Sequence, residues 1–268
     1  MARFGGNTSC VVLEPIGSEP IILDLGTGLR QFGCSLNGST PFAGTALVSH
    51  LHWDHVQGIP FFAPMIVAGS RLDVYGPTQE DGRTLCEAVS DFMRPPYFPV
   101  TIDQLPAEVK ISECPTVPFK VGTATVIARE VPHVGATLGF RVEADGVAVA
   151  YIPDHQQPSD GSYDIADSVL DLCRDADLVI HDAQYTDAEF AQRSTWGHCT
   201  VGYAVHVALE AGAKRLALFH HDPSHDDDQM DVLVAQARRA GRKGGLDVFA
   251  AAEGLQVEVP AARYARVS

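Results

Sequence analysis

The chain has 268 residues, of which 46% are hydrophobic, so it can bury a full core as one large globular domain or two small ones. The formal net charge is −15 and no Lys/Arg-rich run offsets it, which predicts repulsion of a long polyanion and no long nucleic acid as partner. No apolar run approaches the roughly 20 residues of a bilayer span, and the first residues lack the apolar stretch of a secretory signal, so a soluble, cytoplasmic protein without a membrane partner is expected.

Apolar periodicity predicts alternating strands and helices in the first hundred residues. Strands are expected at residues 10–13, 21–23, 46–49 and 71–75. The second strand leads into a glycine-rich turn at 24–28 and the start of a helix at 29–32. A helix is expected at 78–93, and the prolines at 94–99 break it and form a stiff loop that carries aromatic side chains.

The rest of the chain continues the same alternation. Strands are expected at residues 117–119, 123–129, 137–143, 147–152, 178–180, 216–219, 246–250 and 255–259. Asp145-Gly146 is a favoured two-residue hairpin turn. Helices are expected at residues 165–174, 201–211 and 228–240, the last two after capping residues at Thr200 and at 226–228. No linker or internal repeat is readable, so one domain over residues 1–268 is expected.

Polar side chains follow directly on several apolar strands. His50, Asp154, His181 and His220 each occupy such a position. Loops at strand ends of layered α/β folds are where functional sites assemble, so these side chains are expected to converge on one edge.

The run His50-Leu51-His52-Trp53-Asp54-His55 holds four metal-binding side chains within six residues. Imidazole nitrogens and carboxylate oxygens suit borderline metals such as zinc. His50 and His52 can reach one metal from an extended segment, while Asp54 and His55 lie beyond a turn and face a second. Downstream candidates fill the vacancies, and these are His133, Asp154 and His220.

With this signature, the chain resembles the metallo-β-lactamase superfamily of binuclear metallohydrolases. The resemblance is greatest to the branch that contains phosphoribosyl cyclic phosphodiesterases and tRNase Z. The stretches that carry it are Gly5-Gly6-Asn7-Thr8-Ser9-Cys10, Leu23-Asp24-Leu25-Gly26-Thr27-Gly28, Thr137-Leu138-Gly139-Phe140-Arg141, Ile180-His181-Asp182-Ala183 and Gly197-His198-Cys199-Thr200. The fold that the resemblance implies is α/β (α+β), an αββα sandwich of two mixed β-sheets with helices on both outer faces.

The resemblance also implies a site. It places His50, His52 and His133 on one metal and Asp54, His55 and His220 on the other, with Asp154 bridging. The expected cofactors are two divalent ions, zinc first, with manganese or iron also compatible with this ligation. A hydroxide between the ions is the expected nucleophile, oriented by Asp54. His198 matches the general acid of tRNase Z relatives.

Several neighbouring side chains keep two interpretations. His220 is favoured over His221 as the ligand because the strand ends at His220. His181 with Asp182 either orients a ligand or makes a structural hydrogen bond. His155 either lines the pocket or is a surface histidine.

The remaining polar candidates are expected to be structural. His206 is assigned to a helical apolar face, His225 to a solvated acidic loop and Asp24 to bracing of the glycine turn. The six cysteines form no C-x-x-C pair and are expected as reduced thiols, with Cys199 not a nucleophile. The loop at 95–98 either covers the pocket and stacks on a base or caps the core.

The expected activity is that of a metal-dependent hydrolase, a phosphodiesterase for a cyclic phosphate, cyclic nucleotide or other small phosphodiester. His133 and Asp154 are 21 positions apart, which leaves no room there for the long tRNA-gripping arm of tRNase Z. A lactonase or β-lactamase-like hydrolase is the alternative, followed by a diiron redox protein. A homodimer is also compatible with the sequence.

Overall fold

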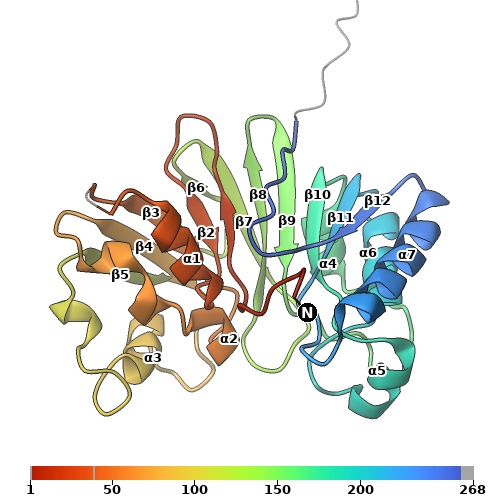
Figure 1. The fold of residues 1–268 in the computed structure, drawn as a ribbon, viewed down its shortest axis with the longest axis horizontal. Helices are drawn as coiled ribbons and strands as arrows, with labels where there is room; N and C mark the ends of the chain where they lie inside the picture. The colour runs from red at the N-terminus through yellow and green to blue at the C-terminus, as the bar shows by residue number, and fades with distance from the viewer. Residues whose placement is uncertain (1, 39, 261–268) are drawn as a thin grey trace, which may run out of the picture. The chain divides into compact units, whose positions relative to one another are not determined.

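The computed structural model describes residues 2–38 and 40–260, which fall into two compact units. The first unit contains residues 6–117 and 133–138, and the second contains residues 2–5, 118–132 and 139–260. Each unit is built on its own β-sheet, five-stranded in the first and seven-stranded in the second (Figure 1).

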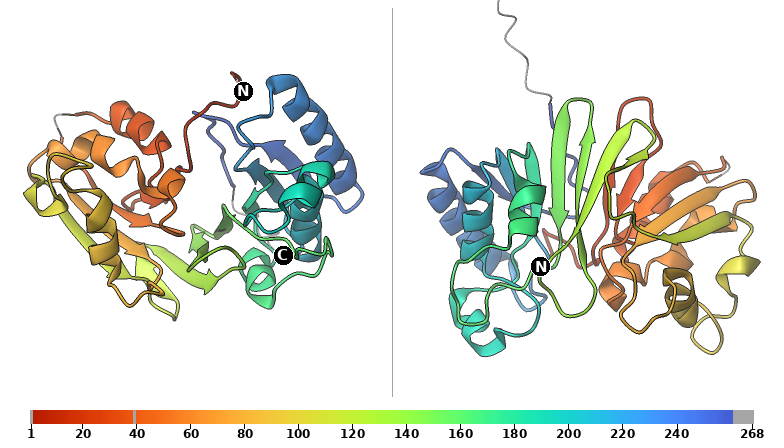
Figure 2. Two further views of the ribbon diagram at one scale, coloured as in Figure 1. Left: turned by 90° about the horizontal axis from the view of Figure 1, so that it is seen from below. Right: turned by 180° about the vertical axis from the view of Figure 1, so that it is seen from behind.

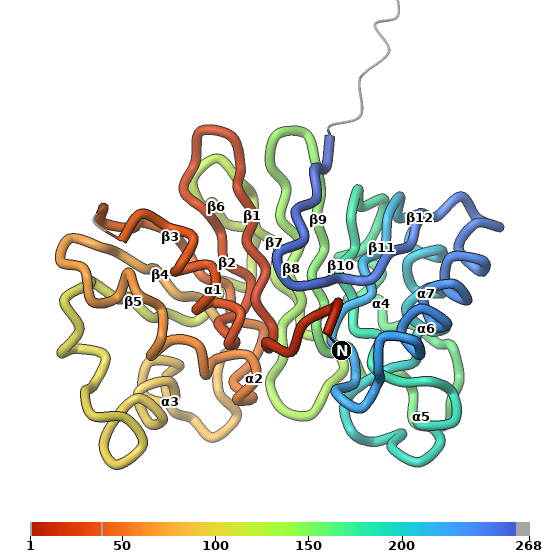
Figure 3. The backbone as a smooth tube through the Cα atoms, in the orientation of Figure 1, coloured from red at the N-terminus to blue at the C-terminus, as the bar shows by residue number. Residues whose placement is uncertain are grey.

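The sheet of the first unit has the order β1-β2-β3-β4-β5. Its strands are β1 (Val11–Leu13), β2 (Ile21–Leu23), β3 (Ala43–Leu47), β4 (Arg71–Gly76) and β5 (Glu108–Glu113). β1 and β2 form an antiparallel hairpin, visible as a tight loop of the backbone in Figure 3, and the other neighbours are parallel. The sheet is therefore mixed, and β2, which lies between β1 and β3, is fully buried, as expected for a strand covered on both faces.

Short helices surround this sheet. They are α1 (Gly28–Ser35), α2 (Trp53–Val56) and α3 (Leu85–Phe92), with 3₁₀ turns at Ile59–Phe61, Ala63–Ile66 and Ile102–Gln104. The helix expected at 78–93 begins only at Leu85, because Thr84 and Glu87 form a reciprocal capping box there. The core beside these helices contains Phe32, Phe42 and Phe62, whose ring centroids lie 5.3–6.1 Å apart.

The sheet of the second unit has the order β12-β11-β10-β9-β8-β7-β6. Its strands are β6 (Phe119–Val121), β7 (Ala124–Glu130), β8 (Leu138–Ala144), β9 (Val147–Ile152), β10 (Leu178–Asp182), β11 (Arg215–Phe219) and β12 (Asp247–Ala250). β9 to β12 are parallel, while β8 pairs with β9 as an antiparallel hairpin. Asp145 and Gly146 form its turn with positive φ angles, as the sequence predicts.

Four helices complete the second unit. They are α4 (Asp167–Cys173), α5 (Asp187–Arg193), α6 (Val201–Glu210) and α7 (Asp227–Arg242). Thr200 and Asp226 cap α6 and α7 by accepting backbone hydrogen bonds, which confirms the predicted caps. α6 and α7 lie side by side in both views of Figure 2.

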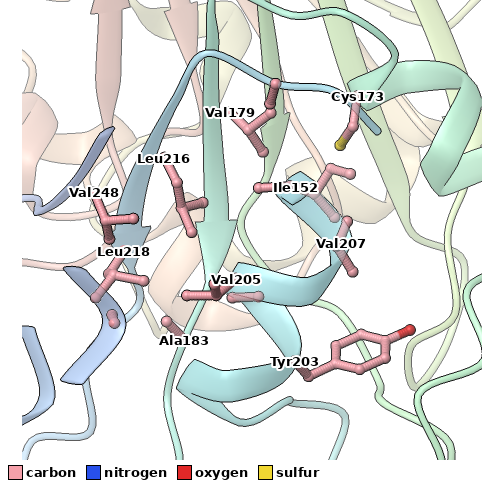
Figure 4. Close-up of a cluster of buried hydrophobic side chains, with 14 of the residues drawn as sticks. Ile152, Cys173, Val179, Ala183, Tyr203, Val205, Val207, Leu216, Leu218 and Val248 are labelled. Atoms are coloured by element: carbon pink, nitrogen blue, oxygen red, sulfur yellow. The ribbon is translucent and has the colours of Figure 1, made fainter. Parts of the chain in front are cut away.

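The core of the second unit lies between α6 and the parallel strands. Val205 and Val207 of α6 meet the side chains of Val179, Leu216 and Leu218 (Figure 4). Burial of these aliphatic groups, together with Ile152 at the end of β9, holds the carboxyl ends of β9, β10 and β11 in place. The residues that follow those ends therefore have a rigid support.

Several elements differ from the sequence prediction. Residues 255–259 form no strand, and α2, β5 and α5 were missed. β5 lies at the edge of its sheet and carries exposed charges at Glu108 and Lys110, so its apolar pattern is weak. Among the described residues, no helix is long and apolar enough to cross a membrane.

Candidate metal centre

Three histidines of the first unit bring their ring nitrogens together. His50 follows the carboxyl end of β3, His52 precedes α2, and His133 follows β7. His52 Nδ1 lies 2.9 Å from His50 Nε2 and 3.3 Å from His133 Nε2. Converging imidazole nitrogens are the donors that zinc and similar cations take in proteins, so this histidine trio fits a metal ion.

A second pair of donors lies on α2. His55 is fully buried and its Nε2 lies 3.4 Å from Asp54 Oδ2, whereas the Asp54 side chain is 37% exposed. One imidazole nitrogen and one carboxylate oxygen therefore face each other within one turn of helix. This pair also matches the donor set of a divalent metal.

Asp24 orients the histidines from behind. This fully buried carboxylate accepts hydrogen bonds from Ser49 N at 2.6 Å, Ser49 Oγ at 2.8 Å and His55 Nδ1 at 2.7 Å. Because a carboxylate only accepts, His55 carries its proton on Nδ1 and turns Nε2 toward Asp54. Ser49 Oγ in turn accepts from His50 Nδ1 at 3.0 Å, which directs His50 Nε2 toward His52.

The sequence analysis predicts that Asp24 braces the glycine turn. Its hydrogen bonds to Ser49 and His55 show instead that Asp24 orients the histidines. Asp24 follows the buried strand β2, the same position that singled out His50. That signal was present in the sequence and was not applied to Asp24. The glycine turn itself is needed for close packing, because a Cβ on Gly26 would lie 2.3 Å from the carbonyl oxygen of Asp54.

We expect Asp24→Asn to weaken metal binding by roughly 10- to 100-fold, the usual effect of losing such a supporting carboxylate. In Asp24→Asn the oxygen that replaces Oδ1 still accepts from Ser49 N, so the amide nitrogen takes the place of Oδ2. That nitrogen cannot accept the His55 Nδ1 proton, so His55 loses its fixed tautomer. Titration of the metal-free protein with Zn²⁺ measures the change. Asp177→Asn is the matched control, because Asp177 is also buried but accepts from Ala148 N and Lys214 Nζ. An unchanged affinity in Asp24→Asn would contradict this role.

The second unit gathers its own group of donors. Asp154, His198 and His220 each present an atom within 4.8 Å of the others. Asp154 Oδ1 lies 3.5 Å from His220 Nε2, and Asp154 Oδ2 lies 3.9 Å from His198 Nδ1. His220 follows directly on β11 and has a φ of 54°, in the left-handed region that few residues other than glycine adopt.

A buried carboxylate holds His198. Asp182 Oδ2 lies 2.9 Å from His198 Nδ1 and also accepts from His155 N at 3.0 Å. His198 therefore carries a proton on Nδ1, and its Nε2 is the atom that can exchange a proton with a bound molecule. Of the two interpretations of Asp182, orientation of a site histidine is the one that this geometry supports.

These donors agree with a family assignment. The family model described as "Beta-lactamase superfamily domain" matches residues 21–221, which is most of the chain. The chain belongs to the metallo-β-lactamase superfamily. The match confirms the predicted family. Members of this family generally bind divalent metals.

Curated relatives of this superfamily member include ribonucleases Z. The enzyme from Methanosarcina acetivorans is 25% identical over 297 residues, which cover 95% of this chain and 93% of the relative. The enzyme from Halobacterium salinarum (strain R1) is 38% identical over 94 residues, but there the match spans only 29% of the relative's length. These relatives place the chain on the tRNase Z branch, and the fold and names together indicate a metal-dependent hydrolase.

Solved structures show the fold. The metallo-β-lactamase fold protein YhfI from Bacillus subtilis has a TM-score of 0.70 and 22% identity, with 94% of this chain and 95% of that chain covered. Human tRNase Z, short form, has a TM-score of 0.67 and 22% identity, with 94% and 93% covered. The predicted fold class, two mixed sheets with helices, is confirmed.

One sequence prediction, that no long nucleic acid is a partner, is wrong. Relatives over nearly the whole chain are named ribonuclease Z, and the similar human structure is a tRNase. The prediction relied on the net charge of the whole chain. Charges are screened beyond about 8–10 Å in physiological salt, so net charge says little about the electrostatic potential at a local site. The short spacing between His133 and Asp154 excludes an insertion only at that position of the chain.

The other histidines of this superfamily member have structural partners. His221 Nε2 donates to Ala251 O at 3.0 Å and burial lowers the pKa of His221 to about 4, which supports His220 over His221 near Asp154. His155 is fully buried and bonds His181 through Nδ1 at 3.0 Å, so it is not a surface histidine. His225 was expected to be solvated but is 2% exposed and bonds Glu189 at 2.9 Å.

Cys199 and the proline loop have simpler roles. The Cys199 thiol is fully buried and donates to Asp182 O at 3.0 Å, and burial raises the pKa of this thiol well above its usual range. A protonated, inaccessible thiol is no nucleophile. In the loop at 95–98, Phe98 packs on the core of the first unit while Tyr97 is 75% exposed.

Proposed function

We propose that this chain is a phosphodiesterase that uses two divalent metal ions. One ion would be held by the histidine trio, and the other by Asp54, His55 and His220. Asp154 would bridge the two ions. Support comes from the donor geometry within each unit and from the complete superfamily signature at residues 50–55.

Zinc is the ion that this donor set fits best. The proposed ligands are five imidazoles and two carboxylates, and this mixed nitrogen and oxygen ligation also accepts manganese or iron. Two ions held by these residues would supply a more acidic water and would neutralise charge that develops on a phosphoryl oxygen. Asp54, whose carboxylate is partly exposed, would orient that water for attack.

The His198–Asp182 pair is the observation that carries the phosphodiesterase proposal. Hydrolysis of a phosphodiester expels an alkoxide, which needs a proton as it leaves. Asp182 accepts from His198 Nδ1 at 2.9 Å and fixes the orientation of the ring, so Nε2 is the atom from which His198 can donate a proton. His198 lies beside Asp154 and His220, which places this acid among the proposed ligands of its own unit.

The proposed substrate is a phosphodiester of a nucleotide. Cyclic phosphates, cyclic nucleotides and short phosphodiesters are the small members of this class. Because relatives are named ribonuclease Z, we include RNA among the proposed substrates as well. A cytoplasmic location, a homodimer and a single domain stay predictions.

A substrate screen tests the function. Purified protein loaded with Zn²⁺ should hydrolyse bis-p-nitrophenyl phosphate and at least one of three natural types: a cyclic nucleotide, a ribose cyclic phosphate or an RNA with a 3′ extension. Release of nitrophenol and product chromatography measure turnover. Lactones serve as the comparison, because the same metal chemistry can attack a carbonyl. Lactone hydrolysis without any phosphodiester hydrolysis would contradict the proposal.

A further inference from the structure

A large aromatic side chain is displayed next to the proposed acid. Trp196 is 62% exposed and lies two residues before His198. Two residues of chain span at most about 7 Å between Cα atoms, so the backbone of Trp196 lies near that of the proposed acid. Exposed single hydrophobic side chains are common, and Trp196 needs further observations to be a binding residue.

The first such observation is a stacked guanidinium. The Arg193 Cζ lies 5.5 Å from the centroid of the Trp196 ring and 5.5 Å from that of Tyr185. Asp222 accepts from Arg193 at 3.1 Å and fixes the guanidinium between the two rings. The Tyr185 ring in turn meets the His198 ring edge-on, with centroids 5.8 Å apart. Arg193 therefore joins the indole to the surroundings of His198 in one packed row.

The second observation is that hydrogen bonds hold the Trp196 loop. The Gln156 side chain donates to Ser194 O at 2.9 Å and accepts from Gly197 N at 2.7 Å, so it grips the loop on both sides of Trp196. Tyr185 N also donates to Cys199 O at 3.0 Å. An indole held in advance loses little conformational entropy when a flat ligand stacks on it.

We propose that Trp196 is a stacking platform for the nucleobase on the leaving side of the phosphodiester. This inference rests on the proposed function, because His198 identifies the leaving side. Hydrolysis forms a bond between phosphorus and a water oxygen and breaks the bond between phosphorus and the ester oxygen. The electron pair of the broken bond stays on the ester oxygen, and His198 supplies its proton. The nucleoside attached to that oxygen then lies nearest to Trp196. Arg193 positions the indole and adds positive charge beside it.

The experiment compares two substrates that differ only in one base. One is a dinucleoside monophosphate, and the other has an abasic ribose in place of its leaving nucleoside. The ratio of kcat/KM for these substrates isolates the contribution of the base. Stacking on an aromatic side chain should make this ratio roughly 5- to 150-fold in the wild type. We expect the ratio to fall close to one in Trp196→Ala and to stay intermediate in Trp196→Phe.

Tyr97→Ala is the matched control, because Tyr97 is another well exposed aromatic side chain, at 75%, and is not part of the Trp196 row. It should keep the wild-type ratio. A wild-type ratio near one, or a ratio that Tyr97→Ala lowers and Trp196→Ala does not, would overturn the platform. Neither result touches the proposed phosphodiesterase activity, which fails if the wild type hydrolyses no phosphodiester.

Discussion

His198→Ala should lower phosphodiester turnover by roughly 10²- to 10⁴-fold, the usual contribution of a positioned acid. The loss should appear in kcat, because His198 acts when the leaving oxygen needs its proton. Since Asp182 already occupies His198 Nδ1, removing the imidazole should leave the proposed metal ligands in place. Metal content should therefore equal that of the wild type.

Steady-state kinetics and metal analysis on the same preparation check this expectation. An activated substrate provides a further test, because a p-nitrophenolate leaving group needs less protonation than an alkoxide and should suffer less from the substitution. His206→Ala is the matched control, since His206 is only half-buried on α6 and meets Tyr163 outside the site. If His198→Ala loses metal together with activity, His198 is a ligand and its assignment as acid is wrong.

Removal of metal should abolish hydrolysis. The proposed ions would both activate water and stabilise charge on the phosphoryl group. Such effects amount to several kcal/mol, so we expect a loss of about 10³-fold or more. Dialysis against a strong chelator, followed by turnover assays with and without added Zn²⁺ or Mn²⁺, measures it. Re-addition of metal should restore activity if the fold is intact.

The control for this experiment is the same chelator saturated with Zn²⁺, which should have no effect. Circular dichroism before and after dialysis separates loss of metal from loss of fold. Full activity in protein from which all metal has been removed would contradict a metal-dependent mechanism.

Much of the fold could be predicted because its central strands are short and apolar. Ile21–Leu23, Val147–Ile152 and Arg215–Phe219 carry continuous buried runs, and the helices α6 and α7 begin at capping residues that are visible in the sequence. The proposed metal ligands were found by the same logic. His50, Asp154 and His220 stand after strands whose carboxyl ends are rigid, and a dense run of donors has few other uses.

The sequence was less informative wherever a side chain depends on distant partners. His225 looks solvated among acidic residues but is buried against Glu189 of α5, 36 positions away. Asp24 reaches Ser49 and His55, which only the pairing of β2 with β3 brings near. The nucleic-acid prediction failed for a related reason, because total charge does not describe a local site.

The number of metal ions per chain tests the central claim most directly. Elemental analysis of purified protein, expressed in zinc-supplemented medium and freed of loosely bound ions, should give close to two ions per chain. Asp154→Ala should lower this number, because Asp154 is the proposed bridge between the ions. One ion or none per wild-type chain, in protein that still hydrolyses phosphodiesters, would contradict the two-metal account.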